Sequence, residues 1–251
     1  MVTFTIVLNI LYITKDRLHF KTIQTFKLDR RPQAIVASEN YLFVIYNTSI
    51  DKYDKKTLNL LDITRPRFAK HLNGGVVKDN LLYCVDNPLA DRNHIYTWDI
   101  DTMHYHGPVD IIDLQFVGTL SSIDYYHGAW WLIYSFYHDH VLDTHVVMFD
   151  INWNSMHSWV FPSKVLNKLK PYSISSGSWK NNIFYCTGHQ NKEIYMFKAY
   201  KNKNVLTYMG TVNANISGQG LSWDRHTPNT LYGLDKDTVV IMKQSPSPSS
   251  L

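Results

Sequence analysis

Histidine and aspartate gather in a few short polar segments of this 251-residue chain, and both residue types can bind metals or move protons. The densest segment is His138-Asp139-His140. Imidazole and carboxylate groups are ordinary ligands of zinc and similar metals, and histidine is well suited to proton transfer near neutral pH. In a strand-like loop, His138 and His140 would lie on one side, as chelation of a divalent metal requires. We therefore expect a metal site at His138 and His140, or a catalytic site at His138, Asp139, His140 and His189.

A purely structural interpretation of these histidines remains an alternative to metal binding or catalysis. Loops are polar, the chain has 12 histidines, and such rings are often solvated or hydrogen-bonded to the backbone. The basic residues also have two interpretations. They form a rim that binds an anionic ligand, or they are ordinary surface charge that keeps the protein in solution. A phosphate, a carboxylate or an acidic peptide would suit such a rim. The basic segments are Arg30-Arg31, Arg65-Pro66-Arg67 and the group Lys164, Lys168 and Lys170.

Composition excludes several classes of protein. With 45% hydrophobic and 18% charged residues, the chain is not intrinsically disordered. A net charge of +4 falls short of a concentrated basic surface, so nucleic acid is not expected as a partner. No apolar run approaches the roughly 18 residues of a membrane span. The apolar start of the chain has no basic residue before Lys15, unlike a signal peptide, so we expect a cytoplasmic protein.

Familiar enzyme motifs are missing. Glycosidases need paired carboxylates, and the chain has two glutamates, Glu39 and Glu193, so the usual Asp/Glu set is absent although a pair of aspartates remains possible. There is no Gly-x-Ser-x-Gly elbow and no phosphate-loop lysine. Cys84 and Cys186 sit in apolar runs and are expected to be buried free thiols.

The elements that must position these residues form an internal repeat. Five times, a turn pair such as Asp79-Asn80 or Asn181-Asn182 precedes a short apolar strand. The equivalent strand positions are Leu42, Leu82, Trp130, Phe184 and Leu231, so the spacing lies between 40 and 54 residues. Each strand is followed by a second one and preceded by a segment rich in small residues, which would line a central channel. Periods of roughly 40 to 50 residues are typical of propellers.

Nearly the whole chain resembles β-propeller repeats. Tyr53-Asp54-Lys55-Lys56-Thr57 and Trp98-Asp99-Ile100-Asp101-Thr102 are similar to the aromatic-Asp-x-x-Thr turns of kelch blades, but no Gly-Gly follows the apolar strands as it does in kelch. The resemblance implies an all-β, single five-bladed β-propeller of four-stranded antiparallel blades. A six-bladed ring and a β-sandwich with accidental spacing are the alternatives.

The expected boundaries follow from the repeat. One domain, 1–244, contains blades at roughly 29–64, 65–113, 114–163, 164–212 and 213–244, and residues 245–251 form a flexible tail. The N-terminal strand 18–28, and within it Leu18 to Phe26, is expected to complete the last blade and close the ring. Residues 3–13 are an extra strand without an assigned place, or the stub of a sixth blade.

Loop order places the chemical residues on one face. His94, His138, His140 and His189 fall between second and third strands, whose loops share a face with the links between blades. We therefore predict a binding module for a protein or a small, anionic ligand, with ligand contacts from His94, Tyr137, Arg67, Arg31 and Asp235. The alternative is an enzyme of the hydrolase, lactonase or lyase type. Its catalytic candidates are His138, His140, His189 and Asp139, with or without a divalent metal.

Overall fold

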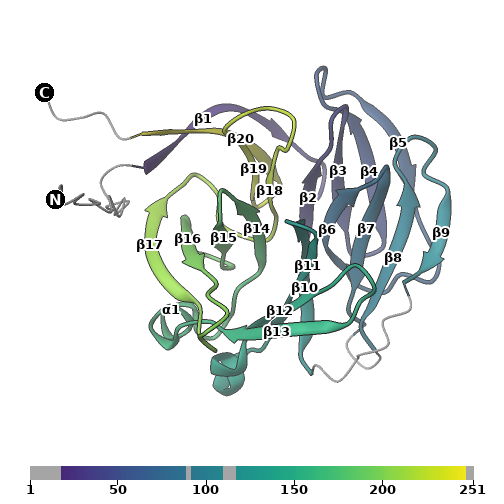
Figure 1. Cartoon of the computed structure of the whole chain (residues 1–251). Coiled ribbons are helices and arrows are strands. Elements are labelled where there is room, and N and C mark those ends of the chain that lie inside the picture. The colour runs from purple at the N-terminus through teal and green to yellow at the C-terminus, as the bar shows by residue number, and fades with distance from the viewer. Residues whose placement is uncertain (1–17, 89–91, 110–116, 247–251) are drawn as a thin grey trace, which may run out of the picture.

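The computed structural model describes residues 18–88, 92–109 and 117–246 and shows five four-stranded antiparallel sheets arranged in a ring (Figure 1). The prediction of a five-bladed, all-β propeller is confirmed. No helix among the described residues is long and apolar enough to cross a membrane.

Four of the blades are contiguous in sequence and run from the ring axis outward. Blade 1 comprises β2 (Ala34–Ala37), β3 (Tyr41–Tyr46), β4 (Ser49–Asp54) and β5 (Leu60–Thr64). Blade 2 comprises β6 (Leu72–Lys78), β7 (Leu81–Asp86), β8 (His94–Asp99) and β9 (Tyr105–Pro108). Blade 3 comprises β10 (Thr119–Tyr126), β11 (Ala129–Ser135), β12 (His145–Phe149) and β13 (Ser155–Val160). Blade 4 comprises β14 (Ser176–Lys180), β15 (Ile183–Thr187), β16 (Glu193–Lys198) and β17 (Thr207–Asn213).

Blade 5 combines both ends of the described chain and closes the ring. It contains β18 (Leu221–Trp223), β19 (Thr230–Asp235) and β20 (Thr238–Pro246), and its outer strand is β1 (Leu18–Lys27). β1 pairs antiparallel with β20 from Leu18 opposite Pro246 to Lys27 opposite Thr238, which confirms the expected closure. β20 extends further than expected. Residues 245 and 246 belong to this strand, whereas we had assigned them to the flexible tail. The expected extra strand at 3–13 and the rest of the tail lie outside the described residues.

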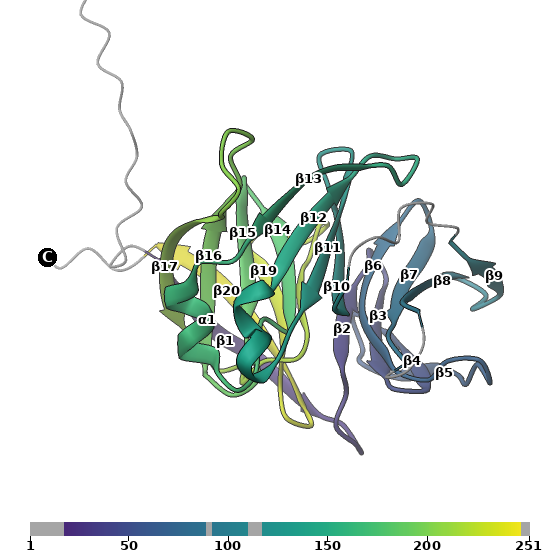
Figure 2. The same cartoon turned by 90° about the horizontal axis from the view of Figure 1, so that it is seen from below.

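Apolar packing between blades explains why these segments form strands. Each inner blade strand is covered on both sides by neighbouring sheets, so β11, for example, is buried along its whole length. Outer strands such as β5 are half-buried or exposed. Five clusters of buried hydrophobic residues fill the five gaps between neighbouring blades, and the outer strands lie at the edge of the ring (Figure 2). Hydrophobic burial therefore stabilises every gap of the ring, most extensively the one between blades 3 and 4.

Side-chain hydrogen bonds join four of the innermost strands, β10, β14, β18 and β2, which have a sheet partner on one side only. The free edge of each would leave backbone N–H groups unpaired. Serine hydroxyls of the preceding blade accept several of these bonds: Ser122 from the Gly177 N–H, Ser176 from the Leu221 N–H and Ser222 from the Ala37 N–H, each at 3.2 Å. Small residues at the axis therefore allow the strands to pack closely, and their hydroxyl groups also accept hydrogen bonds from backbone N–H groups at the free strand edges.

Little open space remains along the axis itself. Residues of all five innermost strands, including Gly75 and Gly177, surround a cavity of about 20 Å³, enough for about one water molecule. At Gly74 a Cβ atom would lie 2.6 Å from the Ser122 Cα atom, so only glycine allows the two backbones to approach this closely. The core of the ring is a packed axis rather than an open pore.

The aromatic-Asp-x-x-Thr segments close the turns between third and fourth strands. In blade 1, the Asp54 carboxylate accepts hydrogen bonds from the Lys56 and Thr57 N–H groups and from the Thr57 hydroxyl, at 2.6 to 3.0 Å. Asp99 makes the same contacts with Asp101 and Thr102 in blade 2. The bonds from Thr57 are the main reason that the pKa of Asp54 is lowered. The motif is thus a local Asp-stabilised turn.

Two short helices depart from the all-strand expectation. The 3-10 helix η2 (His138–Asp143) lies in the loop after β11, and α1 (Ser163–Leu169) lies in the link between blades 3 and 4 (Figure 1). Val165, Leu166 and Leu169 of α1 are buried. The two helices contact each other, and the His138 N–H donates to the Pro171 carbonyl at 2.9 Å.

Candidate functional site

The face that carries the loops after β3, β7, β11, β15 and β19, here called the upper rim, holds the residues singled out in the sequence. Antiparallel pairing places these loops and the links between blades on the same side of the ring. Arg31 and Arg67 lie in links, His138, Asp139 and His140 in η2, His189 in the loop after β15, and Tyr137, His94 and Asp235 at the ends of strands or next to them. Sharing a face does not bring all of them into one site, because they belong to different blades.

A hollow whose wall includes predicted residues lies between blades 2 and 3. Its volume is about 490 Å³, and Tyr137 and His140 are part of its wall. The remaining lining combines polar and apolar groups, from Asn87, Pro88, Gly118, Thr119, Ser135 and Phe136. Burial raises the pKa of Tyr137 to about 12, so its hydroxyl stays protonated near neutral pH and can donate a hydrogen bond.

His189 lies next to this hollow through its contact with Tyr137. The His189 ring stands edge-on to the Tyr137 ring, with centroids 5.9 Å apart, and stacks on Tyr172 at 5.1 Å. Its Nδ1 atom lies 3.2 Å from the Ser173 carbonyl oxygen. Burial lowers the pKa of His189, and the positive charge of Arg31 lowers it further, so the ring is neutral near pH 7. His189 and Tyr137 are therefore in contact from two different blades, and Arg31 acts on His189 through its charge, although neither His189 nor Arg31 lines the hollow itself.

The expected strand-like arrangement of His138 and His140 is wrong. Both lie in η2, and residues two apart in a 3-10 helix point about 120° away from each other. His138, Asp139 and His140 are exposed, and the His140 Nδ1 atom faces the Asp143 carboxylate at 3.6 Å. Within the described parts of the chain, no three His, Cys, Asp or Glu side chains are grouped to hold a metal. The first residue of the helix is held by a tertiary contact, the hydrogen bond from the His138 N–H to the Pro171 carbonyl.

The other candidates are held elsewhere on the upper rim. His94 stacks on Tyr96 of its own strand at 5.5 Å. Asp235 accepts a hydrogen bond from Lys192 Nζ at 2.8 Å; burial raises the pKa of the carboxyl group, but the contacts with Lys192 and Ser217 and the charges of Lys192 and Lys236 together lower it. Arg67 is exposed in the link between blades 1 and 2. None of these three side chains lines the hollow beside Tyr137.

A second polar region on the upper rim was not foreseen from the sequence. Lys168 of α1 contacts Glu193 at the start of β16, with Nζ 2.6 Å from both carboxylate oxygens. The helix itself had a signal, since Pro162 precedes apolar residues at Val165 and Leu169, four positions apart.

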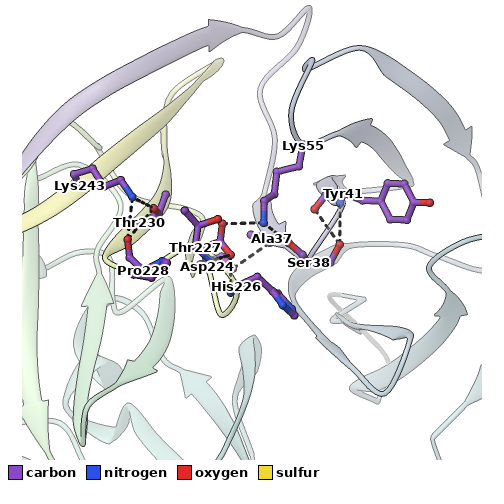
Figure 3. A network of polar contacts seen from close by, with 11 residues as sticks. Ala37, Ser38, Tyr41, Lys55, Asp224, His226, Thr227, Pro228, Thr230 and Lys243 are labelled. Carbon is purple, nitrogen blue, oxygen red and sulfur yellow. Dashed lines mark hydrogen bonds and ion pairs between the residues drawn. The ribbon is translucent and has the colours of Figure 1, made fainter.

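The opposite face carries buried ion pairs that hold blades together. Asp224, in the turn after β18, has a fully buried carboxylate 2.9 Å from Lys55 Nζ of blade 1, and Lys55 also donates to the Ser38 carbonyl at 2.7 Å (Figure 3). Nearby, Arg225 contacts both carboxylate oxygens of Asp124 in blade 3, at 2.8 and 2.9 Å. These charges are already paired across blades, so we assign them to stability rather than to ligand binding.

Comparison with known proteins supports the fold of this chain but does not indicate its function. No family model and no curated protein matches the sequence. Among solved structures, glutaminyl cyclase of Myxococcus xanthus is similar over 91% of this chain and 97% of its own, with a TM-score of 0.64 and 10% identity. The PQQ-bound aldose sugar dehydrogenase of Streptomyces coelicolor is similar over 92% and 99%, with a TM-score of 0.59 and 10% identity. The propeller domain of Cps50 (Swd1) of Myceliophteria thermophila covers 89% and 99% at a TM-score of 0.51 and 8% identity. At these identities the likeness defines the chain as a β-propeller and nothing narrower.

Proposed function

We propose that this β-propeller is a binding module that takes an anionic ligand at the upper rim, in the hollow between blades 2 and 3. The ligand would be a small molecule or an acidic segment of a partner protein. The observation that carries the proposal is a hollow of about 490 Å³ walled by Tyr137 and His140, with the His189 ring against Tyr137 and the positive charge of Arg31 acting on His189. Its size falls in the range of roughly 300 to 1,000 Å³ that is usual for ligand pockets.

The chemistry of these groups favours a negatively charged ligand. Arg31 is exposed and always charged, and its planar guanidinium group can hold a carboxylate or phosphate through two hydrogen bonds. The protonated Tyr137 hydroxyl adds a neutral donor, and His140 adds a ring at the wall. Phe136 gives the same hollow an apolar surface. Cationic, neutral and apolar contacts together would fix an organic anion.

Titration calorimetry with inorganic phosphate and with a Glu-rich peptide tests this site. We expect Arg31→Ala to weaken the tighter of the two about tenfold or more, since a hydrogen bond to a charged group contributes roughly 1.5 to 3 kcal/mol. Tyr137→Phe should have a smaller effect. Lys56→Ala, an exposed cation in a turn on the opposite face, is the control and should bind as the parent does. Absence of binding by both probes, or equal loss in the control, would contradict the proposal.

An enzyme at the same rim is the second candidate, favoured by the neutral His189 ring beside a protonated tyrosine. Such a ring can accept a proton near pH 7. Two of the similar solved structures are enzymes, a glutaminyl cyclase and a sugar dehydrogenase, which shows that the shared architecture accommodates catalysis in those proteins. Hydrolysis of simple lactones and esters that is lost in His189→Gln would favour this candidate, whereas equal rates in both proteins would count against it.

A further inference from the structure

Two neighbouring hollows on the outer part of blade 4 meet at one ion pair. The larger has a volume of about 550 Å³ and the smaller about 180 Å³. Lys168, Glu193 and Asn213 line both of them, so the two hollows form one groove, here called the blade-4 groove. The groove runs between α1, β16 and β17 and reaches the outer strand β1 at Phe20 (Figure 1).

Glu193 is fixed at the centre of this groove. Lys168 Nζ contacts both of its carboxylate oxygens at 2.6 Å, and the Tyr195 hydroxyl donates to one of them at 2.6 Å. The Asn191 amide in turn donates to the Tyr195 oxygen at 3.1 Å. The Glu193 side chain is 20% exposed and Lys168 50%, so the pair faces the groove while its geometry is held from behind. A preorganised carboxylate of this kind can accept further hydrogen bonds from a ligand.

Amide side chains dominate the larger hollow. Gln190, Asn191, Asn213 and Asn215 all line it. Each amide side chain has a hydrogen-bond donor and an acceptor side by side, so it can bond two neighbouring hydroxyl groups of one ligand. Gln190, Asn213 and Asn215 are exposed, so they are accessible to a ligand from solvent. This wall is suited to a ligand rich in hydroxyl groups.

The smaller hollow adds aromatic surface. Tyr195 and Tyr208 line it together with Val165 and the Lys164 side chain. Lys164 Nζ lies 5.9 Å from the Tyr208 ring centroid, and Lys168 Nζ lies 5.8 Å from the Tyr195 ring centroid. Aromatic walls of this type pack against apolar C–H surfaces. A ring that carries hydroxyls at its edge and C–H groups on its face would use both hollows.

The groove carries one more positive than negative charge. Lys168 is paired with Glu193 and Lys192 with Asp235 of blade 5, whereas Lys164 stands over the Tyr208 ring. The Lys164 ammonium group therefore offers a position for an acidic substituent of a ligand.

From these contacts we infer that the blade-4 groove binds an oligosaccharide that carries acidic groups, such as a uronic acid oligomer. Hydroxyls contact the amides and Glu193, a sugar face packs on the half-buried Tyr208 ring, and a carboxylate lies near Lys164. The groove is separate from the hollow beside Tyr137, so this inference does not depend on the proposed function.

Calorimetry with short galacturonate and cello-oligosaccharides tests the inference on the full chain. We expect galacturonate to bind more tightly than the neutral oligomer at low salt, with the preference shrinking as salt screens the lysines. Asn213→Ala should weaken both ligands about two- to tenfold, the effect of one hydrogen bond. Lys164→Ala should remove most of the acidic preference. Asn59→Ala and Lys56→Ala, matched exposed residues of a turn on the opposite face, should change neither ligand.

Each other outcome speaks against the inference. If neither oligosaccharide binds, the groove is not a saccharide site. Binding that survives Asn213→Ala and Lys164→Ala unchanged would place the ligand elsewhere. If a Glu-rich peptide displaces galacturonate at a lower concentration than galacturonate itself requires, the ligand of the groove is an acidic peptide rather than a saccharide. Unfolding midpoints for all four variants show whether a loss reflects binding or misfolding. Tyr137→Phe should leave saccharide binding intact, so failure here and failure of the proposed function remain distinguishable.

Discussion

Removing the Asp124 carboxylate should destabilise the ring, because this group forms hydrogen bonds that connect three blades. Asp124 belongs to β10 of blade 3 and its side chain is 5% exposed. It accepts the Trp179 N–H of blade 4 at 2.7 Å and two bonds from Arg225 of blade 5. Arg225 also donates to the Trp179 carbonyl at 3.0 Å. Asp124→Ala therefore removes the acceptor of the Arg225 Nη2 group and of the Trp179 and Tyr125 N–H groups, and Arg225 keeps only the Trp179 carbonyl.

The expected size follows from the burial of each partner. Breaking a buried ion pair by removing one member costs about 3 to 5 kcal/mol. Arg225 is 35% exposed and water can solvate part of its charge, so we expect the lower end, about 3 kcal/mol. For a chain of this size, that corresponds to a fall in Tm of about 6 to 12 °C. Asp124→Asn keeps an acceptor for Trp179 and should cost about half as much.

Urea unfolding followed by tryptophan fluorescence measures the free energy of unfolding for Asp124→Ala, Arg225→Ala and the double variant. The two changes should be non-additive by about 1 kcal/mol or more, because both remove the same contact. Asp62→Ala, an exposed carboxylate on β5, is the control and should shift stability by less than about 0.5 kcal/mol. Additive losses, or a cost for Asp124→Ala no larger than the control, would refute the assignment of this pair to blade cohesion.

Three further predictions concern closure, the axis and pH. Deleting residues 1–27 removes β1 and exposes the edge of β20, so light scattering should show self-association and the Tm should fall; a monomer of unchanged Tm would contradict the closure. Gly220→Trp should cost about 3 kcal/mol or more, since even a Cβ atom there would lie 2.6 Å from the Ile35 nitrogen, and an unchanged urea midpoint would show the site to be open. Because burial lowers the pKa of His189 below its unfolded value of about 6.5, stability should fall as pH drops through that value, and His189→Gln should flatten the urea midpoint between about pH 7.5 and 5.5.

The blade repeat was predictable because its turns are encoded locally. Asp79 and Asn80 have φ values of 49° and 62°, and Asn181 and Asn182 have 50° and 59°. Asp and Asn tolerate this left-handed region better than most residues, and two such residues in succession make the tight turn that joins paired strands. A turn pair before an apolar run therefore marks the first hairpin of each blade. Closure by Leu18 to Phe26 followed from the same reasoning, because the last unit lacked an outer strand.

The candidate site was less predictable because its geometry depends on contacts between distant segments. Loop order correctly indicates which face a residue occupies, but it does not give the distance from the axis or the side-chain partner. At the start of η2 the His138 N–H donates to the carbonyl of Pro171, a partner distant in sequence that no local pattern reveals. The partnership of Glu193 with Lys168 likewise requires α1 to be folded against blade 4.

The composition of blade 5 also constrains the order in which the molecule can assemble during translation. Leu18 and Pro246 are direct partners, although 228 positions separate them in the chain. Four blades can form hairpin by hairpin as they leave the ribosome, but β1 must wait for β20, the last described strand to be synthesised. Pairing over such a separation is intrinsically slow, since a long loop must be closed before any contact is gained. Until then β1 is an unpaired strand, and a chaperone or a second nascent chain would compete with β20 for it.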